Sequence, residues 1–90
     1  MLFIYPGGDQ YLEFWTKDML IPIDIVFVKA DGTIGAVAAD VPATKPGTPD
    51  GQAVRRSGIG RYVIELGAGE ATRFGLVPGL RLVLPQIEPV

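Results

Sequence analysis

FWTKDMLIPIDIVFV, residues 14–28, is the stretch that decides the fold, and it contains one tryptophan, one lysine and two aspartates in the most apolar part of the chain. Its second half, residues 23–28, alternates between two faces and is rich in β-branched side chains. That period of two predicts a β-strand. The polar side chains in this stretch therefore either form a ligand site or satisfy polar groups beside a hydrophobic core.

The segments around this strand also have the patterns of strands and turns. Asp31-Gly32 between two apolar runs predicts a tight hairpin. Residues 68–74, followed by Gly75, are the one segment that favours a helix, about two turns long. Residues 40–57 are rich in Pro, Gly, Asp and Thr and are predicted to be a long loop. Further strands are predicted at residues 1–5, 33–38, 60–66 and 80–84.

These elements predict an all-β fold, a small barrel-like or rolled antiparallel sheet with one short helix. A chain of 90 residues has room for a single domain, which we expect to span residues 1–90. The apolar run at residues 19–28 contains Pro22 and Asp24 and is too short for a transmembrane helix. As written, the chain is expected to be cytoplasmic.

The composition excludes several kinds of chemistry. The chain has no cysteine and no histidine, which removes disulfides, thiolate metal sites and histidine-based catalytic triads. Its net charge of −2 argues against nucleic acid as a partner, although residues 68–84 faintly resemble the helix-to-strand element of swapped-hairpin DNA-binding regulators. Asp18 and Asp24 lack the further oxygen ligands that Ca²⁺ requires, so we expect neither a metal nor another cofactor.

The polar residues of the deciding stretch are the candidate site. On a strand, Trp15 and Lys17 share one face, which places an aromatic surface beside a cation. With Asp18, Asp24 and Arg61 they would line a groove next to the 40–57 loop, suited to an anionic or carbohydrate-like ligand. In the alternative interpretation Trp15 fills the core, Lys17 lies along it, and Asp24 accepts backbone hydrogen bonds or pairs with an arginine such as Arg61. Arg55-Arg56 would be solvated or would steer an anion toward Lys17.

The same stretch carries a family resemblance. The pattern Phe14-Trp15-x-Lys17 followed by residues 21–27, IPIDIVF, resembles the bacterial and archaeal family of domain of unknown function number 192. Further similarity lies in residues 1–3, in Asp31-Gly32, in residues 61–66 and in residues 69–79. The resemblance implies a compact β-barrel-like domain and no established activity. Many members have an exported or lipid-anchored N-terminus, which offers an exported or periplasmic location as the alternative to the cytoplasm.

Members of this family usually carry a further strand-forming segment upstream of the region that matches residues 1–3. If that segment is missing here, one sheet edge is left uncovered, and such edges normally find a partner strand. We therefore expect a homodimer, or a partner protein, at that edge.

Three hypotheses for the function follow. The first is a ligand-binding or protein-interaction module that uses a polar and aromatic groove. The second is an enzyme that acts on a small polar or carbohydrate-like substrate, with Asp18 or Asp24 as the base. The third is a structural or assembly domain that pairs through the uncovered strand edge.

Overall fold

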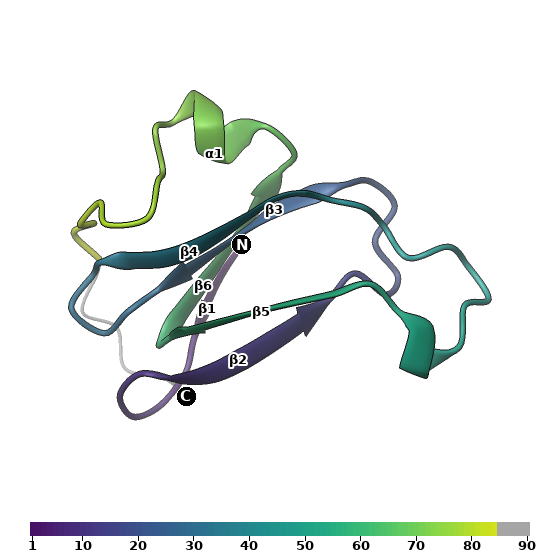
Figure 1. Cartoon of the computed structure of the whole chain (residues 1–90), viewed down its shortest axis with the longest axis horizontal. Coiled ribbons are helices and arrows are strands. Elements are labelled where there is room, and N and C mark those ends of the chain that lie inside the picture. Colours follow the sequence, from purple (N-terminus) through teal and green to yellow (C-terminus); the bar gives the residue numbers. More distant parts are fainter. Residues whose placement is uncertain (85–90) are drawn as a thin grey trace.

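The computed structural model describes residues 1–84 and contains two antiparallel sheets (Figure 1). One sheet has four strands in the order β1-β6-β3-β4, and the other has two, β2 and β5. Two short helices complete the description, the 3₁₀ helix η1 and the α-helix α1. The bounds are β1 Leu2–Ile4, β2 Gln10–Trp15, β3 Ile23–Val28, β4 Ile34–Val41, η1 Asp50–Gln52, β5 Arg55–Gly60, β6 Tyr62–Gly67 and α1 Glu70–Arg73.

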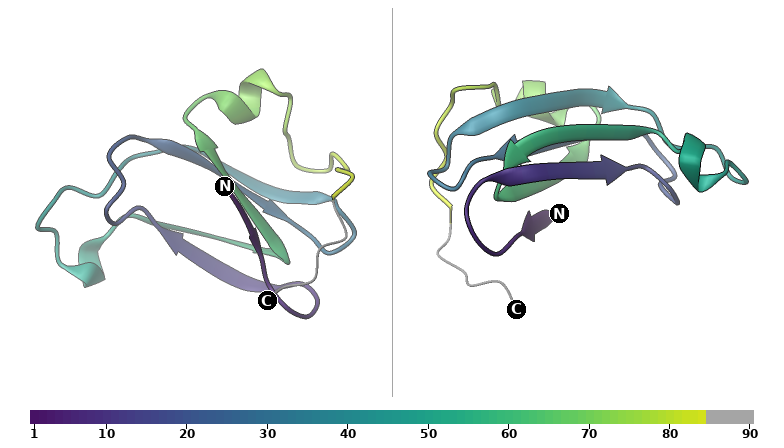
Figure 2. Two further views of the ribbon diagram at one scale, coloured as in Figure 1. Left: turned by 180° about the vertical axis from the view of Figure 1, so that it is seen from behind. Right: turned by 60° about the horizontal axis from the view of Figure 1, so that its bottom comes forward.

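Strand β3 is the centre of the molecule, because all six of its residues are buried. It pairs with β4 on one edge and with β6 on the other. The β2–β5 ribbon covers one face of the four-stranded sheet, and α1 with the segment after it covers the opposite face (Figures 1 and 2). A strand covered on both faces has no solvent side, so its sequence is almost wholly apolar.

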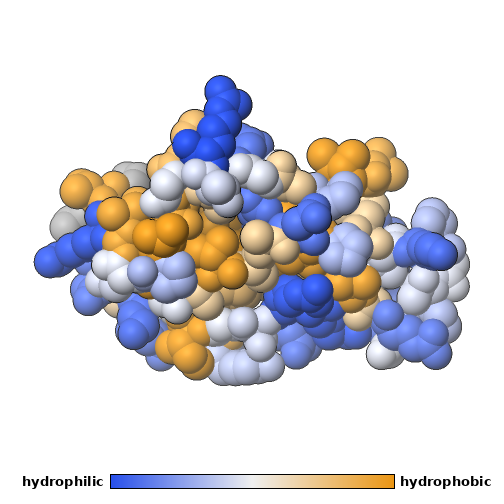
Figure 3. Space-filling model, turned by 45° about the horizontal axis from the view of Figure 1, so that its top comes forward, coloured by the Kyte–Doolittle hydropathy of each residue, from blue (hydrophilic) through white to orange (hydrophobic). Residues whose placement is uncertain are grey.

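Two hydrophobic clusters correspond to these two faces. The cluster between the sheets consists of Leu12, Ile23, Ile25, Phe27, Val41 and Val63. The cluster beneath α1 consists of Val26, Val28, Ile34, Tyr62 and Ala71. Beyond the helix the surface that bears α1 and β4 still presents apolar side chains between polar ones (Figure 3).

The hairpin between β3 and β4 forms where Asp31-Gly32 predicts it. Gly32 has a φ of 91°, and the carboxylate of Asp31 accepts a 2.8 Å hydrogen bond from the backbone N–H of Thr33. Gly32 is also required by space, because a Cβ there would collide with the carbonyl of Leu82. The mainly antiparallel all-β fold with one short helix is likewise confirmed.

Other details of the sequence-based fold were wrong. The two sheets are not closed into a barrel. Strand β5 begins at Arg55, inside the predicted loop, where Gly58 and Gly60 conceal the apolar alternation of a strand. The predicted last strand at residues 80–84 makes one isolated bridge, Thr33 to Arg81, because its backbone hydrogen bonds to the preceding hairpin are limited to Gly32 and Ile34. The helix has only four residues.

Gly58 allows the β2–β5 ribbon to approach β3. A Cβ built at Gly58 would lie 2.5–2.9 Å from three ring carbons of Phe27, which is fully buried. Such contacts are far shorter than van der Waals separation, and the ring has no free space to move into.

We therefore expect Gly58→Ala to lower the free energy of unfolding by about 1–3 kcal/mol, the usual cost of overpacking a core. Urea denaturation followed by circular dichroism measures the change. Gly51→Ala is the matched control, because a Cβ at Gly51 meets no atom within 4 Å. Equal stability of the two variants would contradict the proposed close approach.

Candidate functional site

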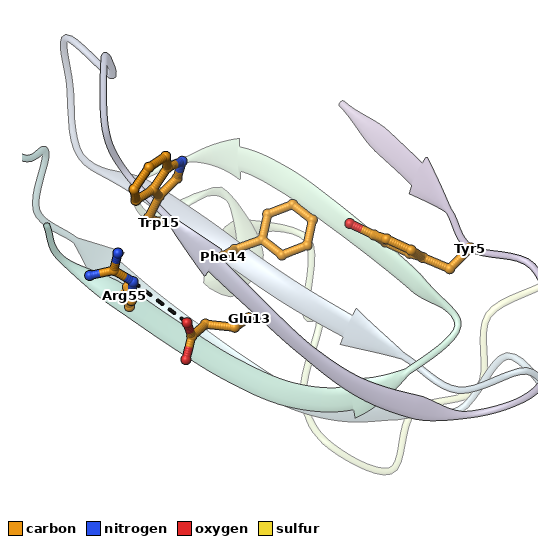
Figure 4. Close-up of a pocket in the computed structure, with 5 residues that line it drawn as sticks. All are labelled: Tyr5, Glu13, Phe14, Trp15 and Arg55. Atoms are coloured by element: carbon orange, nitrogen blue, oxygen red, sulfur yellow. Dashed lines mark ion pairs between the residues drawn. The ribbon is translucent and has the colours of Figure 1, made fainter. Parts of the chain in front are cut away.

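A shallow hollow of about 350 Å³ lies at the outer edge of β2 (Figure 4). Trp15 is the last residue of β2, and its side chain is 40% exposed there. Alternation along β2 turns Leu12 and Phe14 toward the core and leaves Glu13 and Trp15 on the outside. We call this feature the Trp15 hollow, and it is lined by Tyr5, Glu13, Phe14, Trp15 and Arg55.

Two cations lie beside the indole of Trp15. The guanidinium carbon of Arg55 is 5.1 Å from the ring centroid, and the ammonium nitrogen of Lys17 is 5.3 Å from it. Both distances are within the range of a cation–π interaction. The pairing of β2 with β5 places Arg55 directly opposite Trp15, which fixes the guanidinium at this position.

Each of these cations also has an acidic partner. Arg55 Nε lies 3.5 Å from a carboxylate oxygen of Glu13, and Lys17 Nζ lies 2.5 Å from a carboxylate oxygen of Asp50. The hydrogen bond and the negative charge of Asp50 raise the pKa of the Lys17 ammonium. Arg55 also donates to the backbone carbonyls of Ala53, at 3.1 Å, and Asp50, at 2.7 Å. The positive charge around Trp15 is therefore locally balanced.

A pair of buried threonines holds the 42–54 segment against the end of β2. The hydroxyl of Thr16 donates to the carbonyl of Pro42 at 2.8 Å and lies 2.9 Å from the hydroxyl of Thr44. Thr44 in turn accepts a hydrogen bond from the backbone N–H of Val54 at 3.1 Å. Because Thr16 lies between Trp15 and Lys17 in the chain, these bonds position the residues that flank the hollow.

Aromatic packing forms the inner wall of the hollow. The ring of Phe14 meets the rings of Phe3, Tyr5 and Phe27 edge-to-face, with centroids 5.1, 6.2 and 6.4 Å apart. Such contacts are the preferred geometry of aromatic pairs. Burial, and then the negative charge of Glu65, raise the pKa of the Tyr5 phenol. Tyr5 therefore remains a neutral hydroxyl at the rim.

Asp24 lies on the other side of the four-stranded sheet, away from the Trp15 hollow. Its side chain is fully buried and faces α1. One carboxylate oxygen accepts from the backbone N–H of Asp40 at 2.8 Å, and the other accepts from Gly69 at 3.1 Å and Ala71 at 2.9 Å. Burial raises the pKa of this carboxyl, but the three N–H donors outweigh burial, so its pKa lies below the ordinary value.

The remaining two predicted residues lie apart from Trp15. Asp18 has a left-handed backbone, with φ 66°, and lines a second hollow of about 210 Å³ together with Lys17 and residues of the 44–48 loop. Arg61 lies at the turn between β5 and β6. It donates from Nε to the carbonyl of Tyr5 at 3.0 Å, and its guanidinium carbon is 5.4 Å from the Tyr62 ring centroid.

Of the five predicted site residues, the structure thus brings Trp15 and Lys17 together and places Asp18 next to Lys17. It separates Asp24 and Arg61 from them, and Arg61 forms no ion pair with either aspartate in residues 1–84. Sequence reasoning missed Glu13 and the role of Arg55. Alternation along β2 could have found Glu13, but Arg55 required the recognition of β5.

Two negative findings apply to the described part of the chain. Within residues 1–84, no three acidic side chains gather closely enough to hold a metal ion. No helix in the same range is long and apolar enough to cross a membrane. The cytoplasmic or exported location stays a prediction.

Comparison with known proteins agrees with this architecture. The family model described as uncharacterized ACR, domain of unknown function 192, matches residues 1–84. The chain belongs to the domain of unknown function 192 family. None of the curated proteins compared with the chain matches it. Membership of this family confirms the resemblance carried by residues 14–28, and the family has no assigned activity.

Two crystal structures are similar to this member of the domain of unknown function 192 family. A protein of Sinorhizobium meliloti 1021, described as a "putative transcription regulator", is 30% identical with a TM-score of 0.73, and the match covers 90% of this chain and 58% of that one. A protein of unknown function from Novosphingobium aromaticivorans DSM 12444 is 29% identical with a TM-score of 0.66, covering 88% and 52%. The chain therefore spans little more than half the length of both neighbours.

The lowered pKa of Asp24 makes a prediction about stability and pH. A carboxyl whose pKa is lower in the folded protein stabilises the fold above its unfolded pKa, about 3.9, and loses that contribution as pH falls through the folded value. At pH 7 we expect Asp24→Asn to cost about 2 kcal/mol or more, because the buried N–H donors lose a charged acceptor. The cost should shrink as pH is lowered below about 4.

Urea denaturation at a series of pH values tests this expectation. Asp18→Asn is the control, because Asp18 is exposed and Asn tolerates a left-handed backbone. A cost of Asp24→Asn that stays constant from neutral pH to strongly acidic pH would contradict the role of the ionised carboxylate.

Proposed function

We propose that the protein is a binding module and that the Trp15 hollow binds a neutral, hydroxyl-rich ring, that is, a carbohydrate. The observation that carries the proposal is the partly exposed indole of Trp15 beside the ion pair that the carboxylate of Glu13 forms with the guanidinium of Arg55. An aromatic face packs against the C–H face of a sugar ring, while a carboxylate accepts from hydroxyls and a guanidinium donates to them. Small-ligand sites typically combine aromatic side chains with a few polar groups that fix the orientation of the ligand.

The charge balance favours a neutral ligand over an anion. Arg55 is paired with Glu13, and Lys17 with Asp50, so an anion would have to compete with both carboxylates. A neutral sugar ring can bind without displacing either carboxylate from its cation. Glu13 still has acceptor capacity, since an ionised carboxylate offers about four lone-pair sites.

The same geometry favours binding over catalysis. Hydrolysis of a glycosidic bond generally uses two carboxyl groups that flank the bond. The lining of the Trp15 hollow contains one carboxylate, Glu13, while Asp24 is buried, fully hydrogen-bonded and low in pKa. A carboxylate held in its ionised form by three N–H donors is a poor base.

The Sinorhizobium protein is described as a regulator, but we do not propose DNA binding for this chain. Its net charge of −2 gives no basic excess for contact with DNA phosphates.

Trp15→Ala should reduce carbohydrate affinity at least about 30-fold, because truncation of an aromatic anchor that the ligand buries costs about 2 kcal/mol or more. A glycan array of neutral oligosaccharides identifies the sugar, and isothermal titration calorimetry measures the dissociation constant. Phe74→Ala is the matched control, since Phe74 is also exposed and also has an arginine, Arg73, 5.5 Å from its ring centroid. An array on which parent and Trp15→Ala bind alike, or not at all, would contradict the proposal.

A second candidate function, pairing with another copy of the chain, is favoured by the edge of β2 with which no strand in residues 1–84 pairs. The N–H of Thr16 donates to the carbonyl of Val54, so these two residues form a hydrogen-bonded pair. In an antiparallel ladder such pairs alternate with pairs that are not hydrogen-bonded to each other. The even residues of β2 therefore bond to β5, and the backbone groups of Tyr11, Glu13 and Trp15 point away from it. Two such edges related by a two-fold axis are able to pair.

Tyr11→Pro tests this second candidate. Proline removes the outward N–H of Tyr11 without removing a bond to β5, so it should weaken self-association while the fold is kept. Sedimentation velocity over a concentration series of the parent, Tyr11→Pro and the control Tyr11→Thr measures the association. A parent that sediments as one chain at every concentration would rule out pairing through β2.

A further inference from the structure

The outer face of β2 continues beyond the Trp15 hollow and carries a second exposed aromatic residue. Tyr11, Glu13 and Trp15 alternate with buried or half-buried neighbours and therefore lie on the same face of the strand. Tyr11 is 64% exposed and Trp15 is 40% exposed. Two aromatic side chains thus stand on one open sheet face with a carboxylate between them.

The spacing of the two aromatic residues exceeds the size of one sugar ring. Four residues of an antiparallel strand span about 13 Å, at roughly 3.3 Å per residue. A ligand that contacts both aromatic rings must therefore contain several sugar units in an extended chain. A ligand of one or two units meets only the Trp15 hollow.

Polar groups fill the interval between the two rings. One carboxylate oxygen of Glu13 lies 3.3 Å from the hydroxyl of Tyr11, and the other lies 3.5 Å from Arg55 Nε. Across the ribbon, the exposed Ser57 stands opposite Glu13 and adds a hydroxyl group. This interval therefore contains both donors and acceptors for the hydroxyl groups of the central sugar units.

The charge of this face agrees with a neutral chain. Glu13 and Arg55 are the two charged residues among the three cross-strand pairs Tyr11–Ile59, Glu13–Ser57 and Trp15–Arg55, and their charges cancel. Ile59 is 48% exposed beside Tyr11 and widens the apolar surface at that end. The face thus has apolar platforms at its ends and balanced polar groups at its centre.

We propose that the outer face of the β2–β5 ribbon binds a linear neutral oligosaccharide along β2, with Trp15 and Tyr11 as two separate aromatic subsites. This inference rests on the proposed function and extends it from a single ring to a chain. Tyr11 contributes affinity only for ligands that are long enough to reach it. A short ligand of the same sugar binds at Trp15 alone.

Calorimetric titration with two probes tests the inference: the neutral disaccharide and the neutral hexasaccharide of the sugar that the array identifies. The parent should bind the hexasaccharide more tightly than the disaccharide. Tyr11→Ala should weaken hexasaccharide binding about 3- to 10-fold and leave disaccharide binding unchanged. Trp15→Ala should weaken both, and Phe74→Ala neither.

The outcomes separate the two proposals. If Trp15→Ala weakens binding but Tyr11→Ala has no effect on the hexasaccharide, the second subsite is excluded and the proposed function stands. If Tyr11→Ala weakens the binding of the disaccharide and the hexasaccharide equally, the second subsite is also excluded. A local disturbance of the Trp15 hollow would then explain the loss of affinity. If Trp15→Ala changes neither affinity, or neither probe binds, the proposed function itself fails.

Discussion

The complete burial of β3 is the constraint on which the rest of the structure depends. A strand without a solvent face needs a cover on each side, and this small chain supplies one with the β2–β5 ribbon and the other with α1 and the segment that follows it. Asp24 is the one charged residue on β3, and it ties the strand to the second cover. Its carboxylate binds the backbone N–H groups of Gly69 and Ala71 at the start of α1, so a four-residue helix too short to be stable alone is held in place.

The other cover positions the candidate site. Gly58 allows the ribbon to lie against Phe27, and this contact presents the opposite face of the ribbon to solvent. The hydroxyl groups of Thr16 and Thr44 then hold the following loop, which carries Asp50, close to Lys17. The core side of β2 therefore determines the geometry of its outer side. Strand β2 thus contributes Leu12 and Phe14 to the core on one face, and Glu13 and Trp15 to the hollow on the other.

Much of this architecture could be predicted from the sequence. Alternation at residues 23–28, the Asp31-Gly32 turn and the apolar strand at residues 60–66 depend on local patterns, and each is present. Strand β5 could not be predicted from a local pattern. Gly58 and Gly60 are glycines because the strand lies very close to β3 there, and this tertiary requirement leaves no apolar periodicity in the sequence. Asp24 is different, because a local pattern does separate it from Trp15. Nearness in sequence suggested a common site, whereas the period of two places residue 24 on the opposite side of the sheet.

The position of Trp15 has a practical consequence for spectroscopy. The chain contains one tryptophan, and that residue lies in the hollow instead of the core. Its fluorescence therefore reports the local polarity and the nearby charges of Arg55 and Lys17, with no second indole to obscure the signal. Emission from the unmodified protein thus follows events at one surface site, while the packing around β3 must be followed by a different probe.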